Sequence, residues 1–120
     1  MIAIFCGKLL DGGTATIFGD GKQTRDYVFV GDVVRANLAA AESDANGAFN
    51  VGTGKPTDVI EIAESLRELG GGEFNVEHAP ERKGEVQHIH LDTTRAREEL
   101  GWQSEVGLTD GLRITLDSLR

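Results

Sequence analysis

The sequence predicts an α/β protein that forms one small domain, and three observations support this prediction. Short β-prone runs alternate with helical segments along the chain, an order typical of α/β folds. Residues 58–69 carry apolar side chains at helical spacing and form the clearest helix of the sequence. The length of 120 residues is enough for one domain with a modest core.

The first part of the chain predicts a helix and two strands. Residues 2–10 are largely apolar and suit a short helix, which a pair of glycines ends. Residues 16–18 are β-prone, and the glycine-rich residues 19–21 predict a turn. Residues 25–30 alternate between the two faces of an extended chain, so a strand is expected there.

The middle of the chain predicts two helices around a short strand. Asp32 is expected to cap a helix that runs to about Glu42, since its carboxylate can accept from free backbone amides. Residues 48–51 form a short β-prone run between glycine-containing turns. Thr57 is the expected cap of the helix over 58–69, whose acidic first turn suits the helix dipole.

The last part of the chain predicts extended segments followed by two helices. Residues 74–78 are β-prone, and residues 86–91 continue as an extended stretch. A helix capped by Asp92 or Thr93 ends at a glycine. A last helix, capped by Thr109, is expected to run to about Leu119. This order of elements completes the α/β pattern.

The composition excludes several classes of function. There are 20 acidic and 12 basic residues and the net charge is −8, so no nucleic-acid partner is expected. No apolar run approaches the roughly 18 residues of a membrane span, and no membrane association is expected. Cys6 is the single cysteine, so no intrachain disulfide can form, which favours a cytoplasmic protein.

Few residues indicate chemistry by their own pattern. His88 and His90 would share one face of a strand with Asp92 in line, but a fourth ligand is missing, so polar surface is favoured and no metal is expected. Arg25 begins a strand and Arg82 lies in a charged loop, where guanidinium groups suit phosphate. Taken singly, each arginine is more often a solvated surface charge.

Four motifs in order give the chain a family resemblance. They are Thr-Ile-Phe-Gly-Asp-Gly-Lys-Gln-Thr-Arg-Asp-Tyr-Val-Phe-Val-Gly-Asp-Val-Val at 16–34, Phe-Asn-Val-Gly-Thr-Gly at 49–54, Ala-Pro-Glu-Arg-Lys-Gly-Glu at 79–85, and a helix motif within 91–102. The chain resembles the extended short-chain dehydrogenase/reductase (SDR) family. It is most similar to the NAD-dependent nucleotide-sugar epimerases and dehydratases, the UDP-glucose 4-epimerases above all. The resemblance covers essentially the whole chain.

The resemblance implies a fold class and a domain organisation. Residues 1–120 would be a single substrate-binding domain, the C-terminal portion of an extended SDR (Rossmann-type) enzyme without the main dinucleotide-binding sheet. The family's N-terminal NAD-binding domain carries a glycine-rich fingerprint and a Tyr-x-x-x-Lys pair, and this sequence contains neither. NAD belongs to the full-length family, so the chain alone is expected to bind no cofactor and to be inactive.

The resemblance also implies a binding site for a nucleotide sugar, with a UDP-sugar favoured. Arg25 and Arg82 match the two arginines that contact the diphosphate, and Glu85 matches the acidic residue that accepts from the ribose hydroxyls. Two guanidinium groups suit a diphosphate, and a carboxylate suits a diol. No catalytic residue is expected. Three further residues are implied at or beside the pocket for the base: Phe18, Tyr27 and Gln23.

Two functions stay open at this point. The first is the nucleotide-sugar-binding part of an NAD-dependent epimerase or dehydratase of carbohydrate metabolism, an isomerase or lyase. The second is a non-catalytic nucleotide-sugar-binding or oligomerisation module. In the family, the helix from Asp32 and the strand at 48–51 pack on the dinucleotide domain. The chain is therefore expected to self-associate or to bind a missing N-terminal domain.

Overall fold

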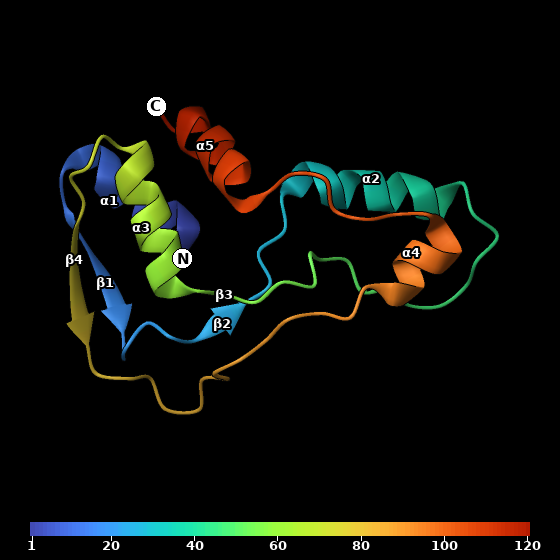
Figure 1. Ribbon diagram of the computed structural model, residues 1–120, viewed down its shortest axis with the longest axis horizontal. Coiled ribbons are helices and arrows are strands. Elements are labelled where there is room, and N and C mark those ends of the chain that lie inside the picture. Colours follow the sequence, from blue (N-terminus) through green and yellow to red (C-terminus); the bar gives the residue numbers. More distant parts are fainter.

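The structure, a computed structural model, describes residues 1–120 and confirms the predicted α/β class (Figure 1). No helix is both long enough and apolar enough to cross a membrane. Helices and strands follow one another in this order: α1 Ile2–Asp11, β1 Thr14–Phe18, β2 Thr24–Arg25, α2 Val30–Ala41, β3 Thr57–Asp58, α3 Val59–Leu69, β4 Asn75–Ala79, α4 Thr94–Leu100 and α5 Leu108–Ser118.

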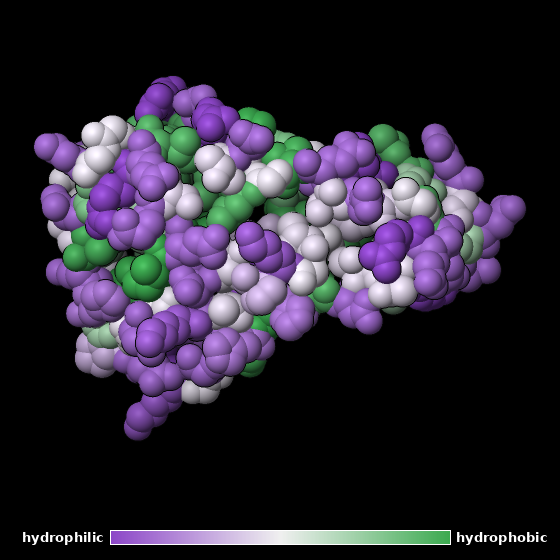
Figure 2. All heavy atoms as spheres, viewed as in Figure 1, coloured by the Kyte–Doolittle hydropathy of each residue, from purple (hydrophilic) through white to green (hydrophobic).

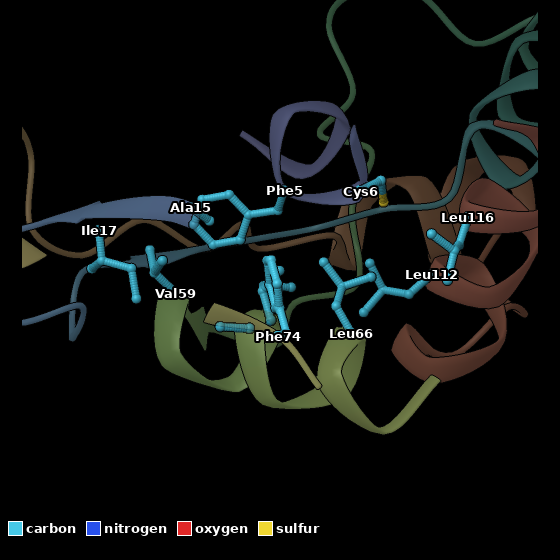
Figure 3. Packing of buried hydrophobic residues seen from close by; sticks show 11 residues of the cluster. Phe5, Cys6, Ala15, Ile17, Val59, Leu66, Phe74, Leu112 and Leu116 are labelled. Atoms are coloured by element: carbon cyan, nitrogen blue, oxygen red, sulfur yellow. The ribbon is translucent and has the colours of Figure 1, made fainter. Parts of the chain in front are cut away.

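The larger part of the molecule is built around the parallel pair of strands β1 and β4. Thr14 lies beside Asn75 at one end of this pair, and the register continues to the other end. α1 packs on β1 and α3, and α5 packs on α3 (Figure 1). The rings of Phe5 and Phe74 meet edge to face, with centroids 6.0 Å apart (Figure 3). Apolar residues from all five elements and from Phe74, just before β4, form or border this core: Phe5, Cys6, Ala15, Ile17, Val59, Ile62, Ala63, Leu66, Phe74, Leu112 and Leu116 are buried, and Val76 packs against them.

A smaller part, formed by α2, α4 and the loop residues that pack against them, extends to one side (Figure 1). Its buried core consists of Ala36, Ala96 and Trp102. The indole Nε1 of Trp102 donates to the carbonyl oxygen of Asp32 over 2.9 Å. The radius of gyration is 16.2 Å, against about 13.6 Å for a compact domain of this length. The molecule is therefore elongated, with two separate clusters of buried side chains.

The outer face of α2 is apolar and open to solvent. Val30, Val34 and Leu38 lie four residues apart and are 69%, 51% and 59% exposed. Apolar atoms appear along the upper edge of the narrow part in Figure 2, over α2. Because the opposite side of α2 packs its Ala36 against Trp102, these three side chains form a stripe that no other element covers.

Two predicted strands differ from the structure. The strand expected over 25–30 is limited to β2, which pairs with the two-residue β3, and α2 already begins at Val30. The two strands are antiparallel, so the position opposite Asp26 would be Pro56, which has no backbone N–H to extend the ladder beyond Arg25. At the other end the ladder stops because Asp58 becomes the N-cap of α3. Residues 48–51 form no strand, because no strand lies beside them. Phe49 and Val51 instead pack on the Trp102 cluster.

The predicted helices lie close to their expected positions, and their first residues differ for local reasons. Asp58, and not Thr57, caps α3: its Oδ1 accepts from the Glu61 amide over 2.7 Å. The last helix begins at Leu108, with Gly107 in the cap position in place of Thr109. A capping side chain can reach an amide two or three residues further on, so neighbouring polar residues compete for the same role.

Candidate functional site

A pocket of about 460 Å³ lies between α1, β1 and the segments that follow β1 and β4. Its volume is within the range of sites for small molecules and cofactors. The structure brings all six residues of the sequence-based site to its walls, although they lie up to 67 positions apart in the chain. These residues are Phe18, Gln23, Arg25, Tyr27, Arg82 and Glu85.

The turn after β1 places the first of these residues. β1 ends at Phe18, and Gly19 and Gly21 both have a φ of +77°, a conformation that glycine adopts without strain. A Cβ on Gly21 would also lie 2.6 Å from Ile60 Cδ1, because this turn packs on the start of α3. Gln23 is buried, and its Nε2 donates to the Phe18 carbonyl over 3.0 Å. Gln23 thereby closes the turn that holds Phe18 at the pocket.

Arg25 and Glu85 form an ion pair at the pocket wall. Arg25 Nη2 lies 3.3 Å from Glu85 Oε1, and the two side chains are 28% and 27% exposed. Arg25 Nη1 also donates to the carbonyl of Thr24 over 2.7 Å. Water reaches this pair, so its net contribution to stability is at most about 1 kcal/mol. Breaking this ion pair therefore costs little free energy, so each side chain can bind a ligand in place of its present partner.

Arg82 covers the aromatic ring of Phe18. The guanidinium carbon lies 3.9 Å from the ring centroid, within the range of a cation–π contact. Arg82 is exposed, and such a contact at an exposed site is worth about 0.5–1 kcal/mol. The ring face of Phe18 is therefore occupied by a side chain that is free to move.

Tyr27 contributes a half-buried phenol. Burial raises the pKa of Tyr27; Arg25 lowers it in part, and Asp58 and Glu85 raise it again. The hydroxyl donates to the sulfur of Met1 over 3.8 Å. Because the pKa of Tyr27 lies above its ordinary value, this phenol is a neutral donor at physiological pH.

Lys8 lines the same pocket, and sequence reasoning did not identify it. A lysine in the last turn of a helix is typical of dipole complementation, so nothing in the sequence singles it out. With Arg25 and Arg82 it gives the pocket three cationic groups against the carboxylate of Glu85. A chain with a net charge of −8 thus gathers positive charge in one apolar-lined pocket, which suits an anionic ligand with an apolar portion.

The remaining chemical candidates of the sequence lie apart from this site. His88 is within 3.2 Å of the Thr24 hydroxyl, and no three His, Cys, Asp or Glu side chains lie together as a metal site requires. Cys6 is buried in the core, and burial raises the pKa of its thiol, so it remains a neutral apolar side chain at neutral pH.

The chain does not form the usual site for a dinucleotide. Such a site places a pyrophosphate at the N-terminus of a helix that directly follows a parallel strand. Here β1 leads into a turn and β2, and β4 leads into the loop of residues 80–93. The chain therefore lacks the strand-to-helix turn that usually holds the pyrophosphate of a dinucleotide.

The comparison with known proteins agrees with this fold. Residues 2–115 match the family described as GDP-mannose 4,6 dehydratase, and the chain belongs to that family. It is 45% identical over 121 residues to UDP-glucose 4-epimerase of Mycolicibacterium smegmatis and 42% identical over 120 residues to a putative UDP-glucose 4-epimerase of Methanocaldococcus jannaschii. Both matches cover 100% of this chain but 39% of the relative. The chain corresponds to a C-terminal segment of such enzymes.

Solved structures show the same fold. UDP-glucose 4-epimerase of Thermotoga maritima, determined with UDP-glucose, superposes with a TM-score of 0.94 at 45% identity, over 99% of this chain and 38% of that one. UDP-N-acetylglucosamine 4-epimerase of Methanobrevibacter ruminantium, in complex with UDP-N-acetylmuramic acid, gives 0.94 at 28% identity, over 99% and 38%. UDP-glucose 4-epimerase of Thermus thermophilus, in complex with NAD, gives 0.89 at 35% identity, over 97% and 38%.

Proposed function

We propose that residues 1–120 form the nucleotide-sugar-binding part of an NAD-dependent nucleotide-sugar epimerase or dehydratase, with a UDP-sugar as ligand. The observation that carries this proposal is the convergence of the six residues on one pocket. The relatives that match over this whole chain include an epimerase solved with UDP-glucose, which supports the choice of ligand.

The proposed ligand replaces contacts that the side chains lining the pocket make with one another. Arg25 turns from Glu85 to the diphosphate, and Arg82 leaves the ring of Phe18 for the same group. Glu85 then accepts from the ribose hydroxyls, and the base covers the freed ring. The contacts that open are weak in water, so charge-assisted bonds to a diphosphate outweigh them.

The full reaction requires more than these residues. Oxidation and reduction of a sugar need NAD and a proton-transferring group next to the sugar, and we assign neither to this chain. The chain spans 39% of the length of the curated relatives. We therefore propose that a dinucleotide-binding domain completes the enzyme, and that the chain alone binds the nucleotide sugar without turnover.

Calorimetric titration of the chain with UDP-glucose, UDP and NAD tests this proposal. UDP-glucose and UDP are expected to bind and NAD is not. Loss of a charge-assisted hydrogen bond costs about 1.5–3 kcal/mol, so Arg25→Ala and Arg82→Ala should each raise the Kd for UDP about 10- to 150-fold. Arg113→Ala is the matched control, because Arg113 pairs with Asp110 on the exposed side of α5. UDP binding that neither pocket substitution weakens would contradict the proposal.

A second function is favoured by the exposed stripe of α2. Val30, Val34 and Leu38 present apolar surface that a stable monomer seldom leaves open. A non-catalytic nucleotide-sugar-binding or oligomerisation module would cover this stripe with another copy of the chain. A chain that stays monomeric in solution would contradict this alternative.

A further inference from the structure

The carboxylate of Asp26 is saturated by donors from two distant segments. Its Oδ1 accepts from the backbone amide and the hydroxyl of Thr53, over 2.8 and 2.7 Å. Its Oδ2 accepts from the amides of Gly54 and Leu91, over 2.8 and 3.2 Å. Four donors leave the carboxylate no role as an acid or base. They also make Asp26 the point at which three stretches of chain are joined.

The space around this carboxylate is closely fitted. A Cβ on Gly52 would lie 2.8 Å from Asp26 Oδ2, so the loop can approach only because that residue is glycine. Three of the four donors are backbone amides, which cannot turn away. An asparagine at position 26 would replace one carboxylate oxygen with an NH₂ group, which would face two hydrogen-bond donors. The side chain of a glutamate would be too long for the space.

Asp26 lies behind the wall of the pocket. Arg25 and Tyr27 line the pocket and Asp26 does not, as expected when successive side chains of an extended segment point to opposite sides. The ladder between β2 and β3 ends with Arg25 opposite Thr57. Beyond that pair there is no strand pairing, and the hydrogen bonds to the Asp26 carboxylate hold the backbone in place instead.

We propose that Asp26 is a positioning residue of the nucleotide-sugar pocket, which holds the backbone of 25–27 from behind and so directs Arg25 at the diphosphate. The inference rests on the proposed function. It predicts that Asp26 affects ligand affinity only when the guanidinium of Arg25 is present. A role confined to stability would lower affinity whether or not that guanidinium is present.

A double-mutant cycle on the Kd for UDP tests this, with folding checked by circular dichroism at the temperature of titration. Asp26→Asn is expected to raise the Kd about tenfold in the otherwise unchanged chain. In an Arg25→Ala background the same substitution should change the Kd less than about twofold. Thr53→Val removes one donor only. It should weaken binding by a smaller factor, so the proposal is testable even if Asp26→Asn does not fold.

Asp32→Asn is the matched control. Asp32 is also a hydrogen-bonded carboxylate, with Arg35 Nη2 at 2.8 Å and the amides of Glu105 and Val106 at 3.1 Å, but it does not line the pocket. It should lower stability and leave the Kd for UDP unchanged. The inference is overturned if the unchanged chain binds UDP and Asp26→Asn binds it equally well, or if the effect of Asp26→Asn persists without Arg25. Failure of the unchanged chain to bind UDP would instead reject the proposed function, and the inference with it.

Discussion

Asp26 directly follows β2, and Asp32, six positions further on, lies in the first turn of α2 and not at its N-cap, which is Phe29. Burial by itself raises the pKa of Asp26, but hydrogen bonds from Thr53, Gly54 and Leu91 outweigh it, and the pKa lies below its ordinary value. Burial likewise raises the pKa of Asp32, and hydrogen bonds from Arg35, Val106 and Glu105 reverse the shift. Both carboxylates are therefore structural in their charged form.

These two lowered pKa values predict a loss of stability in acid. The folded state holds the charged carboxylates more firmly than the unfolded state, whose aspartate pKa is about 3.9. Their contribution is complete above that pH and is lost as the pH falls through the lower folded pKa. Urea unfolding measured between about pH 7 and pH 3 should show the free energy of unfolding decreasing at the acid end, and less steeply for Asp32→Asn. Equal acid dependence in both proteins would contradict this assignment.

Individual helices could be predicted from the sequence because their signals are local. The apolar stripe of α3 is complete within eleven residues, so its position was expected almost to the residue. Strands depend on partners that the local sequence does not contain, so the strand expected at 25–30 is limited to β2 and the one expected at 48–51 is absent. The six site residues could be predicted only from their motifs. Lys8 could not, since only the packing of α1 on β1 brings it to the pocket.

The N-terminus of α3 predicts a measurable capping contribution. Asp58→Ala removes the acceptor for the Glu61 amide and should lower the free energy of unfolding by about 1 kcal/mol, while Asp58→Asn should preserve most of it. Thr93→Ala is the control on α4, because Thr93 occupies the cap position there without a side-chain hydrogen bond. Thermal unfolding in which Asp58→Ala and Thr93→Ala are equally stable would show that the cap is not stabilising.

At the scale of the whole molecule, two small cores share one elongated chain. The principal axes measure 48, 34 and 16 Å, so the shortest dimension leaves room for little more than two layers. The smaller part has three buried residues in its core and depends on polar contacts such as those of Asp32. A body of this shape leaves apolar side chains without cover, and the stripe on α2 is the clearest example.

This stripe predicts that the chain is not monomeric on its own. At micromolar concentration, sedimentation should show species of at least about twice the 12.9 kDa of one chain. Val34→Glu with Leu38→Glu should restore the monomer, because charge replaces the apolar surface. Ile114→Glu, a change of an exposed apolar residue on α5 outside the stripe, should not. A sharp monomer of the unchanged chain, with cooperative unfolding, would contradict the prediction.

The two parts of the molecule also carry separate optical labels. Trp102 is the only tryptophan and lies 2% exposed in the smaller core, and Tyr27 is the only tyrosine and lines the pocket. Excitation at the red edge of the indole band therefore reports on the small core alone. Tyrosine absorbance reports on the pocket. The unmodified chain can thus be observed at both places without a dye, and the order in which they respond to ligand or denaturant can be read directly.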